Sequence, residues 1–287
     1  MKKLLILSGK GGTGKTTVAA AFIDLLRAEA FADCDVDAPN LHLVAGMTAL
    51  PERRNYFGAQ KAFIDTDKCA GCGACKDNCR FSAISLTGGH CEVNEYACEG
   101  CGVCQFVCPN GAVQMRDDIA GEQMLYRDGR VFSTAKLRMG RGNSGKLVTE
   151  VKTALIKSAG AANIAVIDGS PGIGCPVIAS VSGVDLVLIV AEPSLSGIHD
   201  MERIQKTAGI LGAKAAVCVN KYDTCPENTQ AIERFCAENG VPYAGRIPYD
   251  KQASAAINSG HSLASVDCPA RAALIGVLAN VLTLLEE

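Results

Sequence analysis

Eight of the fifteen cysteines in this 287-residue chain form two runs with the same internal spacing. In each run two residues separate the first three cysteines from one another, and three residues separate the third from the fourth. The runs lie 29 positions apart (98 − 69), and they are Cys69, Cys72, Cys75 and Cys79, followed by Cys98, Cys101, Cys104 and Cys108. Thiolates at this spacing can surround one face of an iron–sulfur cube, so the pattern predicts a pair of clusters.

The repeat continues beyond the predicted ligands. Residues 83–86 read AISL and residues 112–115 read AVQM, and Pro109 follows the last cysteine of the second run. These features resemble a bacterial two-cluster ferredoxin, an α+β fold with two similar halves. The resemblance implies two 4Fe-4S clusters, each with three ligands from one run and the fourth from the other. The ligand sets would be Cys69, Cys72, Cys75 and Cys108, and Cys98, Cys101, Cys104 and Cys79.

Two features qualify this interpretation. Paired C-x2-C motifs also bind zinc, so two zinc sites are the alternative to two clusters. Arg80 stands where a proline usually follows the fourth ligand of such a run, which alters the surroundings of one cluster without removing a ligand. Cys91 falls outside both runs, and we expect it to be structural.

A second segment with clear chemistry lies near the start of the chain, where residues 9–17 read GKGGTGKTT. An apolar run precedes it and another follows it, which predicts a buried strand and a helix on its two sides. Glycines allow backbone N–H groups to turn towards phosphate oxygens, and the helix N-terminus adds positive potential. Lys15 is expected to bind the β- and γ-phosphates of ATP, and Thr16 to ligate Mg²⁺. The predicted phosphate site consists of Gly9, Gly11, Gly12, Thr13, Gly14, Lys15, Thr16 and Thr17.

A further lysine, Lys10, directly follows the first glycine of this loop. The two-lysine motif KGGTGKTT resembles the deviant Walker A loop of the MinD/ParA/nitrogenase-iron-protein superfamily of P-loop ATPases. The resemblance implies an ATP-dependent homodimer in which Lys10 reaches the nucleotide of the partner subunit. A solvated loop lysine is the alternative.

Three later segments resemble the same family in chain order. The first is the sequence DCDVDAPN, which resembles its first switch; this implies that Asp35 orients the attacking water and that Asp33 lies near the magnesium shell. Residues 164–168 read IAVID, an apolar strand that ends in the carboxylate of a Walker B motif, Asp168. Residues 169–174 resemble the second switch, a glycine-rich loop that responds to the γ-phosphate.

The resemblance also implies contacts with the nucleotide base. The apolar runs 186–190 and 216–219 are expected to be further buried strands, and the second leads into Asn220. In the family this asparagine recognises adenine. Pro248 and Tyr249 resemble the loop that covers the base.

Strands that alternate with helical stretches predict an α/β fold, a doubly wound parallel sheet with the nucleotide at the carboxyl ends of the strands. The cysteine runs interrupt this pattern, so the expected domains are a discontinuous P-loop ATPase, residues 1–59 and 117–287, and an inserted ferredoxin domain, residues 60–116. Residues 117–152 form a locally basic part of the ATPase, with Asp128-Gly129 at a hairpin turn. This part is either a solvated hairpin, a docking surface for an acidic redox partner, or a dimer contact.

One short segment does not fit the pattern. The helix after the phosphate loop is expected to run to about Glu29, yet Asp33 must already end the second strand. Only Ala30, Phe31 and Ala32 remain for a turn and a strand. Either the helix ends early, or several residues present in the family are absent here.

Cys175 lies seven residues after Asp168 (175 − 168). This offset resembles that of the cluster ligand in the nitrogenase iron protein. The resemblance implies that two copies of Cys175 face each other across a dimer axis and hold a further metal or cluster. A free buried thiol at a strand end is the alternative.

The composition excludes some partners and compartments. The chain is 48% hydrophobic and 20% charged with a formal net charge of −2, so no nucleic-acid partner is expected. The cysteines are interpreted as ligands and free thiols in a reducing cytoplasm, and the first residues as a strand rather than a signal peptide. The apolar stretch 270–285 lacks the basic face of a membrane-binding helix, so no membrane partner is expected.

These patterns favour a Mg²⁺-dependent, partner-stimulated ATPase. The leading hypothesis is an ATP-hydrolysing homodimer that couples its nucleotide state to iron–sulfur chemistry. That chemistry would be assembly of a metal cofactor or cluster, or ATP-gated electron transfer to an acceptor protein. The alternatives are a MinD/ParA-like positioning or partition ATPase with structural clusters, and a synthetase of the dethiobiotin type.

Overall fold

The computed structural model describes residues 1–287, which divide into two compact units. Three of the four divisions fall within strands β3 (Glu52–Phe57), β8 (Ile119–Arg127) and β9 (Val131–Leu137), and the fourth lies between Asn143 and Ser144. The larger unit consists of residues 1–53, 123–136 and 144–287, and the smaller unit of residues 54–122 and 137–143. The predicted insert, residues 60–116, lies within the smaller unit.

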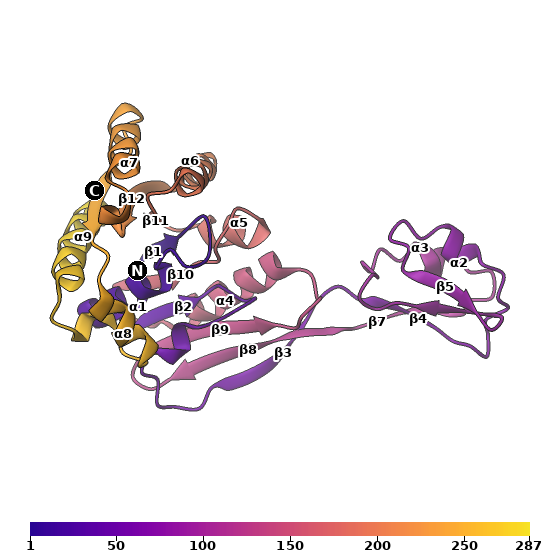
Figure 1. The fold of residues 1–287 in the computed structure, drawn as a ribbon. Helices are drawn as coiled ribbons and strands as arrows, with labels where there is room; N and C mark the ends of the chain where they lie inside the picture. The colour runs from indigo at the N-terminus through magenta and orange to yellow at the C-terminus, as the bar shows by residue number, and fades with distance from the viewer. The chain divides into compact units, whose positions relative to one another are not determined.

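The sheet has nine strands in the order β13-β12-β11-β1-β10-β2-β9-β8-β3, and every pairing from β13 to β9 is parallel (Figure 1). Its central strands are continuous apolar runs because both of their faces are buried. Besides β3, β8 and β9, this sheet consists of β1 (Lys2–Leu7), β2 (Ala30–Asp33), β10 (Ile164–Asp168), β11 (Leu186–Ala191), β12 (Lys214–Asn220) and β13 (Tyr243–Ile247).

Helices cover both faces of the parallel sheet. Leu4 and Ile6 of β1 pack in one core with α1 and α9. Leu5 and Leu7 point to the opposite face and are also fully buried, and α5 and α6 contact β1 and β11. The helices of this unit are α1 (Lys15–Leu26), α4 (Ser144–Ser158), α5 (Cys175–Val181), α6 (Leu195–Ile210), α7 (Pro226–Glu238), α8 (Lys251–Asn258) and α9 (Pro269–Glu286). The expected α/β fold with a mostly parallel sheet is confirmed.

The crowded segment between α1 and β2 is explained by an early end to the helix. Arg27 adopts a left-handed conformation (φ 49°) and its N–H donates to Ile23 and Asp24, which closes α1. Strand β2 then needs only four residues, all of them buried. They suffice because β2 pairs with β10 on one side and β9 on the other.

Helix α9 is long and apolar enough to cross a membrane by length and composition. Its buried residues, among them Leu274 and Val281, lie in the same core as α1. Core helices also have this length and composition, and one third of this helix is buried.

The smaller unit consists of two similar halves. Strand β4 (Lys61–Ile64) pairs antiparallel with β7 (Val113–Arg116), and β5 (Ile84–Thr87) pairs antiparallel with β6 (His90–Val93). Two one-turn helices, α2 (Ala74–Asp77) and α3 (Val103–Phe106), follow Gly73 and Gly102, whose φ values are 79° and 77°. A shift of 29 residues converts β4 into β6, α2 into α3 and β5 into β7, so the sequence repeat is also a structural repeat.

The basic segment consists of β8, β9 and α4. Between the two strands Gly129 has a φ of 82°, at the predicted turn. The Asp128 carboxylate accepts a hydrogen bond from the Thr48 N–H at 3.0 Å, which ties this turn to the chain after β2.

Candidate functional site

The predicted nucleotide residues converge on one cavity of about 900 Å³ at the carboxyl ends of the parallel strands. Gly9, Asp33, Asp168 and Cys175 do not line it. The predicted residues that line it are Lys10, Gly11, Gly12, Thr13, Gly14, Lys15, Thr16, Thr17, Asp35, Asn220, Pro248 and Tyr249.

The phosphate loop connects β1 to α1. Gly12 and Gly14 have φ values of 82° and 93°, a conformation that favours glycine and turns the loop back before the helix. A side chain at Gly14 would also overlap the amide of Asn220 at 2.3 Å. The left-handed backbone therefore favours glycine at both positions, and the close approach of Asn220 is a second reason at Gly14.

A buried ion pair lies at the base of the cavity. The Lys15 ammonium contacts one oxygen of Asp168 at 2.5 Å, and the Thr16 hydroxyl donates to the other at 2.7 Å. Burial alone lowers the pKa of Lys15, but the Asp168 carboxylate outweighs it, so the pKa lies above its ordinary value. The three residues predicted for phosphate and magnesium thus form one connected group.

Asp33 organises the loop that follows β2. One of its oxygens accepts from the Asp35 N–H at 3.0 Å, and the other from the N–H groups of Asn40 and Leu41 at 2.9 Å each. Burial and the charge of Asp168, its neighbour in the sheet register, raise the pKa of Asp33 to about 7. Its carboxylate holds the predicted first switch, while a magnesium role for Asp33 stays a prediction.

The predicted second switch contacts the strand ends through backbone groups. The Gly172 N–H donates to the Ser8 carbonyl at 3.0 Å, and the Ser170 hydroxyl donates to the Cys34 carbonyl at 2.6 Å. A side chain at Gly169 would overlap Leu7 at 2.3 Å. This loop therefore links the phosphate loop to the first switch.

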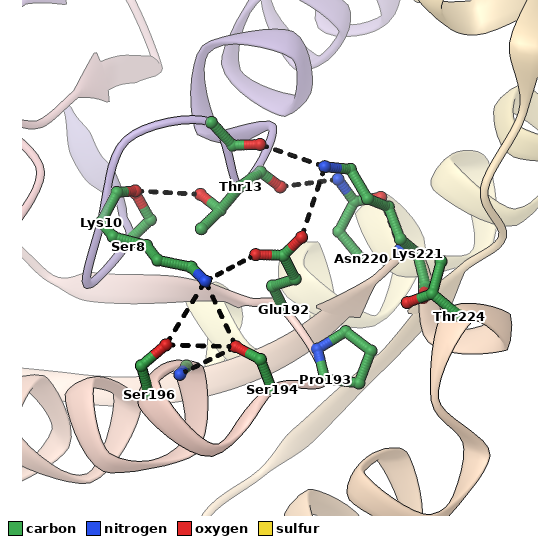
Figure 2. A network of polar contacts seen from close by, with 12 residues as sticks. Ser8, Lys10, Thr13, Glu192, Pro193, Ser194, Ser196, Asn220, Lys221 and Thr224 are labelled. Carbon is green, nitrogen blue, oxygen red and sulfur yellow. Dashed lines mark hydrogen bonds and ion pairs between the residues drawn. The ribbon is translucent and has the colours of Figure 1, made fainter.

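Lys10 binds residues of its own chain. Its ammonium lies 2.9 Å from the Glu192 carboxylate and donates to the hydroxyls of Ser194 and Ser196 at 3.2 and 3.4 Å (Figure 2). Its side chain is 38% exposed, so the contact lies at the mouth of the cavity. The hydrogen bond from Lys10 lowers the pKa of Glu192. Transfer of Lys10 to a partner subunit would require this contact to break.

Asn220, the last residue of β12, and Lys221, which follows it, support the phosphate loop. The Asn220 amide donates to the Thr13 carbonyl at 2.7 Å, and the Lys221 ammonium donates to the Gly12 carbonyl at 3.1 Å. Lys221 also contacts Glu192 at 3.5 Å (Figure 2). Asn220 therefore lies where it can contact a nucleotide, although its adenine role stays a prediction.

Sequence reasoning missed several residues of the cavity mouth. Glu192 and Lys221 directly follow β11 and β12, and that position at the carboxyl edge of a parallel sheet was the available signal. Helix α8 supplies Ser254 and Ile257 to the cavity wall, and no motif marked them.

In the smaller unit the eight predicted ligands lie around two cavities, in the crosswise sets expected. One cavity is lined by Cys69, Cys72, Cys75 and Cys108, and the other by Cys98, Cys101, Cys104 and Cys79. Backbone N–H groups of Ala83 and Ala112 donate to the fourth cysteines, Cys79 and Cys108, at 3.4 and 3.3 Å. Nowhere do three Cys, His, Asp or Glu side chains converge closely enough to hold a single metal ion.

Cys175 is exposed at the first residue of α5. Its carbonyl and Cβ would lie 3.2 and 3.3 Å from a side chain added at Gly145, the second residue of α4. No other cysteine is part of this contact, so the bridging role of Cys175 stays a prediction.

The larger unit thus has the fold and the phosphate loop of a P-loop ATPase. Residues 4–263 match the family model of the CobQ/CobB/MinD/ParA nucleotide binding domain, and the chain belongs to this family. Two uncharacterized proteins of Methanocaldococcus jannaschii are related to it. MJ0578 is 33% identical over 225 residues, 76% of this chain and 78% of the relative, and MJ0579 is 28% identical over 262 residues, 88% and 87%.

Solved structures show the same fold at lower identity. MinD of Pyrococcus horikoshii, complexed with Mg-ADP, has a TM-score of 0.58 and 18% identity and covers 98% of this chain and 95% of its own. McdA of Cyanothece without nucleotide has a TM-score of 0.58 and 19% identity, with coverage of 98% and 99%. The expectation of a MinD/ParA-type P-loop ATPase is confirmed.

Proposed function

We propose that this protein is an ATP-hydrolysing homodimer that couples its nucleotide state to two 4Fe-4S clusters in the smaller unit. The observation that carries the proposal is the crosswise arrangement of eight cysteines around two cavities, in the same chain as a phosphate loop.

The cysteines suit clusters rather than single ions. The four predicted ligands of each site lie around a cavity instead of meeting at a point, which is the arrangement that the corners of a four-iron cube require. Three of the four come from one half and the fourth from the other. When bound, the clusters would accept and donate single electrons, and the thiolates would hold them.

The ATPase part of the proposal rests on the three connected residues Lys15, Thr16 and Asp168 at the base of the large cavity. Lys15 would bind the phosphates, and Thr16 with Asp168 would hold the magnesium shell. The carboxylate of Asp35 lines the cavity at the predicted first switch, from which it can orient water. Hydrolysis would release the switch loops that Asp33 and Gly172 attach to the strand ends.

Dimerisation would use Lys10 in trans, after release from Glu192. The acceptor would be a redox protein or a metal-cofactor protein, with a reducing cytoplasm as the compartment. We include Cys175 as a site for a further metal between subunits. Replacing it with serine and measuring iron per dimer tests this addition, because unchanged iron content contradicts it.

A second candidate is a positioning or partition ATPase whose clusters only stabilise the fold. The comparisons favour it, because the matched family and solved structures include MinD and ParA-type proteins. It predicts ATP-dependent dimers with no nucleotide effect on the iron.

The test is a measurement of both cluster potentials with and without MgATP on anaerobically purified protein. Coupling predicts that nucleotide changes a potential or the rate at which a chelator removes iron. If neither changes while ATP is hydrolysed, the positioning function is the correct one. Absence of bound iron from protein reconstituted with iron and sulfide would contradict both cluster interpretations.

A further inference from the structure

The first cluster cavity contains a fifth cysteine. Cys91 lies on β6, is 2% exposed, and lines the same cavity as Cys69, Cys72, Cys75 and Cys108. Its backbone N–H donates to the Cys69 sulfur at 3.5 Å, and its side chain lies in one buried cluster with Cys75, against which Cys69 packs. Cys91 therefore faces the predicted ligands and is not a packing residue elsewhere in the core.

The second cavity provides an internal comparison. The structural repeat of 29 residues places Ala62 of β4 at the position of Cys91 (91 − 29), and Ala62 lines the second cavity. Their strand partners correspond as well, because Cys91 pairs with Leu86 and Ala62 with Met115. The two sites thus differ by one sulfur at an equivalent position, five thiols against four.

We infer that Cys91 is a reserve ligand of the first cluster, able to take the place of Cys75 on the same iron. The inference rests on the proposed function, since it requires clusters in these cavities. For the exchange, the Cys91 thiol loses its proton to solvent as its sulfur binds iron. The bond from iron to Cys75 breaks, Cys75 takes up one proton, and no electron is transferred.

The consequence is that the two clusters are not equivalent. The first site can lose one ligand and still bind its cube through four sulfurs, whereas the second cannot. The first is then the site that can open one iron to an incoming thiol without losing the cluster.

The experiment removes equivalent ligands from the two sites of the full-length holoprotein. Cys75→Ala and Cys104→Ala are compared after anaerobic reconstitution with iron and sulfide. Wild type is expected to bind about eight iron ions per chain, the content of two four-iron cubes. Cys75→Ala should retain that content, and Cys104→Ala should lose at least one iron per chain and release iron to a chelator at least about tenfold faster.

Two double variants identify the sulfur responsible. Cys75→Ala with Cys91→Ala should lose iron as Cys104→Ala does. Ala62→Cys with Cys104→Ala should restore the lost iron, because it gives the second cavity the fifth sulfur. The variant that combines Ala62→Cys with Cys104→Ala also tests the inference if Cys75→Ala does not fold.

The outcomes separate this inference from the function on which it rests. Wild-type protein that binds no cluster contradicts the proposed function. Wild-type protein with two clusters, combined with equal iron loss in Cys75→Ala and Cys104→Ala, overturns only the reserve ligand. Failure of Ala62→Cys to restore the iron content of Cys104→Ala also overturns only the reserve-ligand inference.

Discussion

Asp168 connects the lysine of the phosphate loop to the hydroxyl expected to ligate magnesium. Its two oxygens contact Lys15 and Thr16, and its side chain is fully buried. A group in this position must be charged to hold metal-bound water next to the phosphates. The contacts therefore explain why a carboxylate ends β10.

Asp168→Asn should lower Mg²⁺-dependent ATP hydrolysis by at least about 100-fold, since the amide keeps the shape but removes the charge. Phosphate release with magnesium and with a chelator measures the effect. Asp185→Asn is the matched control, because Asp185 directly precedes β11 at the far end of the strands and its carboxylate accepts only the Lys3 N–H among the hydrogen bonds described. A variant at Asp168 that keeps the wild-type rate would contradict the assigned role.

In the proposed dimer, Glu192 would compete with the partner's nucleotide for Lys10. The ion pair is partly exposed, and such pairs contribute about 0.2–1 kcal/mol. Glu192→Gln should therefore strengthen ATP-dependent dimerisation about twofold to fivefold, which sedimentation with a non-hydrolysable ATP analogue would measure. Glu238→Gln, on the exposed end of α7, serves as the control. Weaker dimerisation of Glu192→Gln would argue against release of Lys10 towards a partner.

Helix α4 holds the end of α5 through one buried lysine. The Lys152 ammonium donates to the carbonyls of Ala179, Ser180 and Ser182 at 2.9, 2.6 and 2.6 Å. Carbonyls at a helix C-terminus lack partners within the helix and attract a cation. Because α5 begins directly after the second switch, this contact also fixes the helix that the switch must move.

Lys152→Met should lower the free energy of unfolding by about 1–3 kcal/mol, as it leaves buried carbonyls without donors. Burial, together with the charge of Lys3, lowers the pKa of Lys152 from 10.5 to about 8, while Cys34 opposes the shift. The unfolded chain then binds more protons between those values, so this lysine makes wild-type stability rise as pH rises through that window.

The rise should be absent from Lys152→Met. Urea unfolding of both proteins at several pH values between about 7 and 10 measures the difference. A constant gap between the two unfolding free energies across this range would show that Lys152 has an ordinary pKa.

The two units differ in how much apolar surface each can bury. The larger unit has an extended core between the sheet and its helices. The core of the smaller unit has nine buried residues, four of which are cysteines: Ala62, Ile64, Cys75, Ala83, Ile84, Cys91, Cys98, Cys104 and Val113. If the proposed clusters are bound, so small a core would depend on them to remain folded.

Removal of iron should therefore unfold the smaller unit and leave the larger one intact. Hydrogen exchange of chelated protein should show loss of protection in residues 54–122, with residues 144–287 unchanged. Nucleotide affinity, measured on the same samples, is the control for the larger unit. Equal protection of residues 54–122 with and without iron would contradict metal-dependent folding.

Local patterns were sufficient for the phosphate loop, the strand that ends in Asp168 and the two cysteine runs, whereas the crosswise cysteine sets came from the resemblance to two-cluster ferredoxins. Glycine spacing, an apolar strand that ends in Asp168, and a repeat of 29 residues each act within a short stretch of chain. Such short-range features constrain the backbone geometry directly, so they can be predicted from the sequence alone. The α/β class followed from the same alternation of strands and helices.

The remaining features depend on strand order, which no local pattern specifies. Glu192 meets Lys10 because β11 lies beside β1. Cys91 reaches Cys75 because β6 pairs with β5, and α2, which carries Cys75, packs against β5. The early end of α1 likewise follows from the need to bring β2 into register with β10. Which residues distant in sequence come into contact depends on the packing of the whole chain. For that reason the contact of Glu192 with Lys10 and the position of Cys91 in the first cluster cavity could be found only in the folded structure.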